Sequence, residues 1–142
     1  MGGLVAAQLI ARHGKGREIG RVVMLAPPNQ GSEIADALSA LPPYHWIYGP
    51  AGQQLVTART TQPPPDYALG IIAGSYGNPY LLGRMLIRGA HDGRVSVERT
   101  RQPGMRDHLT VSASHSFIMR KPIVHRQVLA FLAHGQFDRV AT

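Results

Sequence analysis

Apolar residues recur along the chain at two spacings, one typical of helices and one of buried strands. Residues 2–13 carry apolar side chains at helical spacing, and the glycines that follow end this predicted helix. A second, short helix is expected over 33–40, because Ser32 is a good N-cap. A last helix is expected within 121–137, with a proline in its first turn and a glycine at its end. The residues expected to line one face of this last helix are Ile123, Val124, Val128, Leu129 and Leu132.

Three segments have the composition of strands. RVVMLAPP (21–28) holds an apolar run without alternation, which predicts a strand buried on both faces, as in a parallel sheet. YALGIIAG (67–74) is a second strand of the same kind, and LTVSA (109–113) is a third. Because these strands alternate with helices, the predicted fold class is α/β with a parallel sheet of about three strands.

A long segment rich in proline, glycine and glutamine separates the first two strands. It covers 41–66, contains the single tryptophan, Trp46, and has helical potential over 50–58. A connection of this length is typical of a lid or a pocket wall, and an ordinary packed insertion explains it equally well. The sequence leaves these two interpretations open.

Composition limits the class of protein. With 142 residues and 44% hydrophobic content, the chain is long enough for one domain with a core. It has no cysteine, which excludes disulfides and thiolate metal sites. No segment reaches the roughly 18 apolar residues of a membrane span, and none has the pattern of a signal peptide.

The chain is basic, with a formal net charge of +7 from 15 basic and 8 acidic residues. Its arginines are scattered, and no lysine run or aromatic-interleaved basic stripe occurs. A solvated surface explains such a distribution better than a nucleic-acid interface does. We therefore expect no nucleic-acid partner.

The first residues raise a separate question, because the chain opens with MGGLV and a helix follows at once. This pentapeptide resembles the second half of the nucleophile elbow, the G-x-S-x-G turn of α/β-hydrolases. In many bacterial lipases and esterases of this family the turn reads G-H-S-M-G-G-L-V. The resemblance implies that the nucleophilic serine is the residue before Met1.

Four later segments resemble parts of the same family: the strand-to-helix turn, the acid loop, the histidine loop and the final helix. In order they are VVMLAPPNQGSEIAD (22–36), DGRVSV (92–97), SASHSFIM (112–119) and VLAFLAHGQF (128–137). The resemblance implies an α/β-hydrolase of lipase or esterase type. It covers nearly the whole chain but only the C-terminal half of the fold, so 1–142 is expected to be a partial domain.

The resemblance assigns roles to three residues. Asp92 is the triad acid, which orients the imidazole of His115, and His115 is the general base. The backbone N–H of Met1 is an oxyanion-hole donor, although a chain that starts there has a charged amine instead. No cofactor and no metal are expected.

Alternatives to these assignments remain at the sequence level. Asp92 with the glycine after it also fits a simple turn, and Asp107 is a rival acid. Ser75, in A-G-S-Y-G, is a poor match to an elbow, and Ser32 fits an N-cap better than a nucleophile. Ser114 and Ser116 are expected to shape the loop around His115, and His91 lacks the spacing of a metal ligand.

These assignments predict a serine hydrolase acting on small-molecule or lipid esters, without activity in a chain that lacks the serine. The alternative is a non-catalytic binding module built on a hydrolase remnant. The strand at 21–26 is expected to have one bare apolar edge, which favours self-association.

Overall fold

A computed structural model describes residues 2–13, 19–38 and 64–139. Most of the predicted insertion at 41–66, including its helical part, lies outside these ranges. The strands are β1 (Arg21–Leu25), β2 (Ala68–Gly74) and β3 (Asp107–Val111). The helices are α1 (Gly2–His13), α2 (Glu33–Leu38), α4 (Leu81–Leu86) and α5 (Pro122–His134), with 3-10 turns η2 (Glu98–Thr100) and η3 (Ile118–Arg120).

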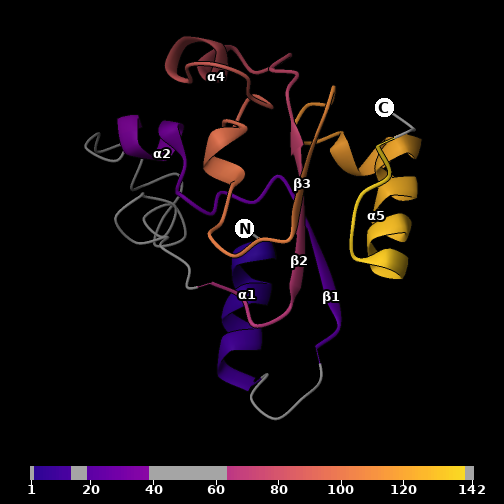
Figure 1. Cartoon of the computed structure of the whole chain (residues 1–142). Helices are drawn as coiled ribbons and strands as arrows, with labels where there is room; N and C mark the ends of the chain where they lie inside the picture. Colours follow the sequence, from indigo (N-terminus) through magenta and orange to yellow (C-terminus); the bar gives the residue numbers. More distant parts are fainter. Residues whose placement is uncertain (1, 14–18, 39–63, 140–142) are drawn as a thin grey trace.

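The described strands form one parallel sheet in the order β1-β2-β3. In its register, Gly70 of β2 lies between Val23 of β1 and Asp107 of β3. Helix α1 covers one face of the sheet and α5 covers the other (Figure 1). The expected fold class, a parallel α/β sheet of three strands with flanking helices, is confirmed.

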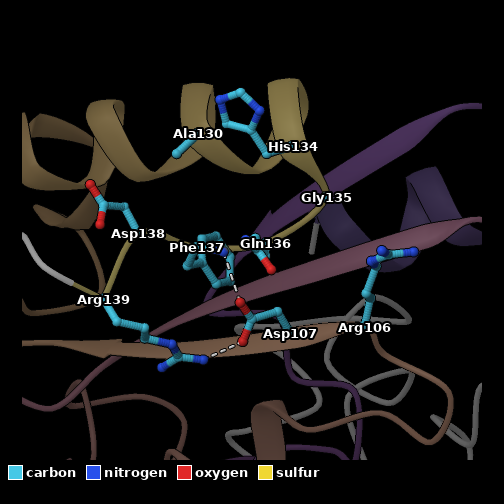
Figure 2. Close-up of a pocket in the computed structure, with 9 residues that line it drawn as sticks. All are labelled: Arg106, Asp107, Ala130, His134, Gly135, Gln136, Phe137, Asp138 and Arg139. Atoms are coloured by element: carbon cyan, nitrogen blue, oxygen red, sulfur yellow. Dashed lines mark hydrogen bonds and ion pairs between the residues drawn. The ribbon is translucent and has the colours of Figure 1, made fainter.

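The chain that follows α5 returns to the amino end of β3. The backbone N–H of Phe137 donates to Oδ2 of Asp107 over 2.7 Å, and Arg139 forms an ion pair with the same carboxylate (Figure 2). The buried side chain of Gln127 bonds both backbone groups of Asp138, over 2.7 and 2.8 Å. These bonds fix the end of the chain against the sheet.

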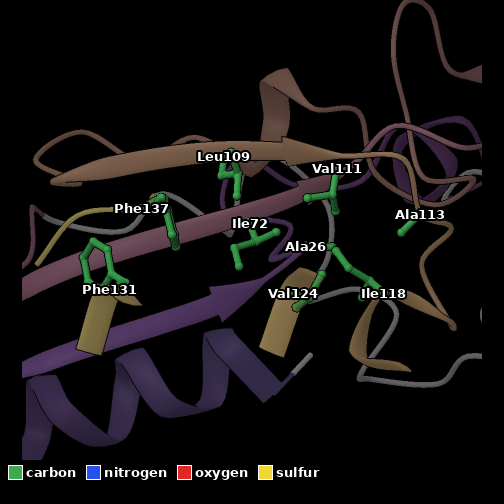
Figure 3. Packing of buried hydrophobic residues seen from close by; sticks show 9 residues of the cluster. All are labelled: Ala26, Ile72, Leu109, Val111, Ala113, Ile118, Val124, Phe131 and Phe137. Carbon is green, nitrogen blue, oxygen red and sulfur yellow. The ribbon is translucent and has the colours of Figure 1, made fainter. Parts of the chain in front are cut away.

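Two apolar clusters, one on each face, explain the unbroken apolar runs of the strands. Leu69 and Ile71 of β2 pack with Ala7 of α1, whereas Ile72 points to the opposite face. There it joins a cluster that includes Leu109 and Phe131 (Figure 3). Successive strand residues thus serve two cores, as expected for a parallel sheet covered on both faces.

The buried face of α5 differs from the expected one. Val124 and Phe131 are fully buried and Ile123 and Val128 pack beside them, but Leu129 is 68% exposed. Leu132 is also exposed. The buried stripe includes Gln127, whose paired amide allows a polar side chain at a core position, and this shifts the stripe away from the leucines.

Two other expectations need correction, and one helix was not expected. Val5 and Leu9, two of the apolar residues that give α1 its helical spacing, are 60% and 61% exposed, whereas Ala7 is buried in the core. The third strand begins earlier, at Asp107, and ends at Val111 rather than at residue 113. Helix α4 was not predicted, since its six residues are too few to show a period.

Helix α1 begins beside the carboxyl end of β1. A Cβ built on Gly3 would lie 3.3 Å from both the sulfur of Met24 and Cβ of Pro27, so a glycine permits this close approach. The first turn of α1 therefore lies at the edge of the sheet where the strands end. In open α/β sheets this edge is where functional side chains gather.

Candidate active site

Asp92 and His115, the two residues expected to form a dyad, lie together at the carboxyl edge of the sheet. Asp92 belongs to the loop between α4 and η2, and His115 follows β3. A Cβ on Gly74, the last residue of β2, would lie 2.8 Å from Cβ of Asp92 and would overlap the carbonyl oxygen of Ala113. The absence of a side chain at this strand end lets the two loops meet.

The carboxylate of Asp92 faces the imidazole of His115, with Oδ2 2.6 Å from Nδ1. The backbones are joined as well, because the N–H of His115 donates to the carbonyl oxygen of Asp92 over 2.9 Å. This pairing is the one that orients an imidazole for general-base chemistry. The structure thus brings together two residues that are 23 positions apart in the chain.

The other oxygen of Asp92 is also occupied. Oδ1 accepts the backbone N–H groups of Arg94 and Val95, over 2.9 and 2.8 Å. The side chain is only 1% exposed. A carboxylate can be buried in this way because its hydrogen bonds replace those lost from water.

The imidazole of His115 is partly open to solvent, with 28% of the side chain exposed. Because Nδ1 faces Asp92, Nε2 is directed away from the carboxylate. The turn that carries it is closed by two bonds to the carbonyl oxygen of Ser114, from the N–H groups of Phe117 and Ile118, over 3.0 and 2.9 Å. A partly exposed imidazole whose Nδ1 is held by a carboxylate is suited to proton transfer at Nε2.

The segment after β1 is bonded to the acid loop and to the η2 turn that follows it. The side-chain amide of Asn29 donates to the carbonyl oxygen of Thr100 over 2.9 Å. The hydroxyl of Ser32 donates to the carbonyl oxygen of Arg94 over 3.1 Å. Arg99 lies 3.3 Å from Glu33 and also pairs with Asp36 of α2. These contacts therefore fix the position of helix α2 relative to the acid loop and the η2 turn.

Tyr80 is a residue of this site that the sequence did not reveal. It precedes α4, its ring lies against Gly93, and the guanidinium of Arg94 lies 5.3 Å from the ring centre. Its hydroxyl donates to the hydroxyl of Ser116, the residue after His115. The only available sequence signal was the turn N-P-Y, which indicates a bend and not a contact.

The rival acid, Asp107, lies at the opposite edge of the sheet. It begins β3, and its carboxylate is bound by Phe137 and Arg139. It also lines an open pocket of about 730 Å³ between the start of β3 and the end of α5 (Figure 2). This pocket is formed by the amino end of the strand, so Asp107 is not the partner of His115.

The serines considered as alternatives have other contacts. Ser75 follows β2, and its hydroxyl donates to the carbonyl oxygen of Val111 over 3.2 Å. Ser32 directly precedes α2, as expected of an N-cap position, and its hydroxyl reaches the acid loop. Ser114 is buried beneath the histidine turn, and Ser116 accepts the Tyr80 bond.

His91 lies beside the acid without facing it. Its Nδ1 accepts the backbone N–H of Gly93 over 3.0 Å, and its ring lies close to Gly77, where a Cβ would overlap it. Across the described ranges, no group of three or more histidine, aspartate or glutamate side chains is arranged to hold a metal ion. Met1, the expected oxyanion donor, lies outside the described residues.

The helices that the structure describes include none with the length and apolar character of a membrane span.

Comparison with known proteins identifies the fold. No protein-family model matches the sequence, and no curated protein matches it. Bacillus licheniformis lipase BlEst2 in its mature form matches with a TM-score of 0.71 and 21% identity, over 94% of this chain and 62% of the lipase. Its propeptide form matches with a TM-score of 0.63 and 21% identity, over 78% of this chain and 29% of that one.

The chain therefore has a lipase-like α/β-hydrolase fold, as the sequence resemblance implied. It spans less than two thirds of the length of the mature lipase. Its sheet and helices correspond to the C-terminal part of the α/β-hydrolase fold.

Proposed function

We propose that this chain supplies the acid and the base of a serine hydrolase that cleaves carboxylic esters, small or lipid. Asp92 is the triad acid, His115 is the general base, and the nucleophile is a serine directly before Met1. The observation that carries this proposal is the bond between Nδ1 of His115 and the buried carboxylate of Asp92. That bond occupies Nδ1, so Nε2 is the ring nitrogen left for proton transfer.

The position of α1 supports this location of the nucleophile. Its first described residues lie beside the end of β1, at the same edge of the sheet as the dyad. In an α/β-hydrolase the nucleophile occupies a sharp turn between a strand and the helix that follows it. The residue before Met1 would occupy that turn, and the Met1 N–H would donate to the oxyanion.

In each half of the proposed reaction Nε2 of His115 first takes a proton and then returns it. Nε2 of His115 takes the serine proton as the serine oxygen bonds to the ester carbonyl carbon, and Asp92 stabilises the imidazolium at Nδ1. The imidazolium then protonates the leaving alcohol as the ester C–O bond breaks. Water, deprotonated by the same nitrogen, releases the acid and restores the serine.

The proposal predicts that activity requires both His115 and polypeptide upstream of Met1. The native protein, isolated from its source cells, should be heavier than 15.4 kDa by intact mass. A fluorophosphonate probe should label the serine directly before Met1 in that protein. His115→Ala should slow labelling on the order of a thousandfold or more, since the base activates the nucleophile.

Two controls define the outcome. His134→Ala removes an exposed imidazole at the far edge of the sheet and should leave labelling unchanged. The 142-residue chain alone should show neither labelling nor ester turnover. A native mass of 15.4 kDa, or labelling that survives His115→Ala, would overturn the proposal and favour a non-catalytic binding module.

A further inference from the structure

The geometry points to Tyr80 as a positioning residue that holds the His115 loop against the Asp92 loop. This inference rests on the proposed function, because the dyad is what Tyr80 positions. Tyr80 touches both loops: its ring contacts Gly93, and its hydroxyl donates to Ser116. Neither contact involves the dyad itself.

Tyr80 has a fixed place in the fold. Its backbone N–H donates to the carbonyl oxygen of Gly77 over 3.0 Å, which closes the turn before α4. A Cβ on Gly83, in the first turn of α4, would overlap the carbonyl oxygen of Gly93. The start of α4 is therefore packed directly on the acid loop, with no side chain between them.

The ring of Tyr80 contacts two consecutive residues of the acid loop, Gly93 and Arg94. Gly93 has a φ of +96°, and a Cβ there would overlap the ring, so glycine is required for both reasons. The guanidinium of Arg94 lies 5.3 Å from the ring centre, within the range of a cation–π contact. The ring is thus a rigid extension of the loop that carries Asp92.

The hydroxyl of Tyr80 extends this rigid unit to the other loop. The histidine loop has two bonds to the acid loop, both made by His115 to Asp92, one from its backbone and one from its ring. Both bonds come from one residue of the histidine loop. The Tyr80–Ser116 bond attaches that loop at a second residue, one position further along, and so restricts how the loop can shift relative to Asp92.

The bond is well placed to affect geometry more than stability. Ser116 is exposed and Tyr80 is partly exposed, so water replaces the bond when it is removed. We therefore expect Tyr80→Phe to keep the ring contacts with Gly93 and Arg94. The melting temperature should fall by less than about 5 °C.

The test is a proton NMR measurement on the 142-residue chain, which needs no nucleophile. The ring proton on Nδ1 of His115, bonded to Asp92, serves as the probe, and its exchange rate with water is measured. Tyr80→Phe and Ser116→Ala should each accelerate exchange roughly two- to tenfold, the factor expected for one net hydrogen bond. Tyr76→Phe, which removes an exposed hydroxyl outside these loops, should leave the rate unchanged.

An internal reference separates positioning from general loosening. The Nε2 proton of His108, which bonds Thr100 over 2.9 Å, should exchange at the wild-type rate in each variant. Unchanged exchange at His115 in both variants, or equal acceleration at His108, would overturn the inference. Asp92→Asn tests the dyad itself. If the His115 ring-proton signal is unaltered in this variant, the proposed function fails as well. If only Tyr80→Phe leaves the exchange rate unchanged, only the role of Tyr80 is refuted.

Discussion

At the scale of single residues, the buried carboxylate of Asp92 both holds the imidazole of His115 and bonds the backbone of its own loop. A carboxylate removed from water is unfavourable by several kcal/mol unless donors surround it. Two of its donors are backbone N–H groups of its own loop, and the third is the ring of His115. The carboxylate that orients the imidazole therefore also shapes the loop, and a neutral substitute weakens both.

His108 predicts a pH dependence of stability. Burial and, to a lesser degree, the nearby Arg101 lower its pKa below the ordinary 6.5, while Asp107 and Glu98 partly oppose the shift. Between the lowered pKa and 6.5 the unfolded chain binds more protons, so stability falls as the pH falls through this range. Above 6.5 the imidazole is neutral in both states and contributes no pH dependence.

The measurement compares urea unfolding of the wild type and His108→Gln from about pH 7.5 to about pH 5. Glutamine keeps an N–H donor for the hydroxyl of Thr100 but does not titrate. The wild type should lose stability relative to the variant as the pH falls. A difference that stays constant with pH would contradict the lowered pKa of His108.

The contact between Asp92 and His115 was expected from sequence because a family resemblance added to their local signals. Asp92 stands in a turn with glycine and His115 stands after a strand, and a family resemblance supplied their roles. Tyr80 could not be predicted, because its two contacts lie 13 and 36 positions away along the chain and leave no local pattern. Asp107 matched the local pattern of an acid near a strand, and only the strand direction excluded it.

At the scale of elements, the packing of α5 on the sheet depends on a glycine in the central strand. A Cβ on Gly70 would lie 2.7–2.9 Å from ring atoms of Phe131. Gly70→Ala should therefore destabilise the protein by about 1–3 kcal/mol, because a packed ring must shift. Urea unfolding measures the change.

The control is Gly20→Ala, which adds a Cβ where no atom lies within 4 Å. It should change stability by less than about 0.5 kcal/mol. Phe131→Leu should relieve part of the overlap, so that the double variant with Gly70→Ala loses less than the sum of the two single changes. Additive losses would show that the overlap with this ring is not the cause.

The sequence predicted the elements better than it predicted their faces. An unbroken apolar run predicted strand β2. A proline and a glycine at its two ends predicted helix α5. The face of α5 did not follow, since a buried glutamine displaced leucines to the surface. Gln127 is buried because its amide bonds Asp138, a partner that no periodicity reveals.

At the scale of the whole molecule, the two edges of the sheet carry different groups. Because the described strands are parallel, their carboxyl ends share one edge, and this edge holds the dyad. The amino edge holds the pocket lined by Arg106 and Asp107. A parallel sheet thus separates the proposed chemistry from the end of α5, so changes at either edge can be made independently.

The outer strand β1 leads us to expect self-association of the chain. Within the described residues β1 pairs only with β2, so the backbone groups on its other side have no strand partner. Such an edge favours pairing with another chain. The net charge of +7 opposes this association through repulsion between copies. Salt screens repulsion but leaves backbone hydrogen bonds nearly unchanged.

Self-association of the 142-residue chain should therefore increase with salt. Light scattering after gel filtration should give a mean mass that rises between about 0.05 and about 0.5 M NaCl. Leu9→Lys tests the competing route, in which the exposed apolar side of α1 makes the contact. A salt response that persists in Leu9→Lys supports the strand edge, since the substitution lies on a helix. A mass that stays monomeric in the wild type at every salt concentration, or a response abolished by Leu9→Lys, would show that the edge of β1 does not drive assembly.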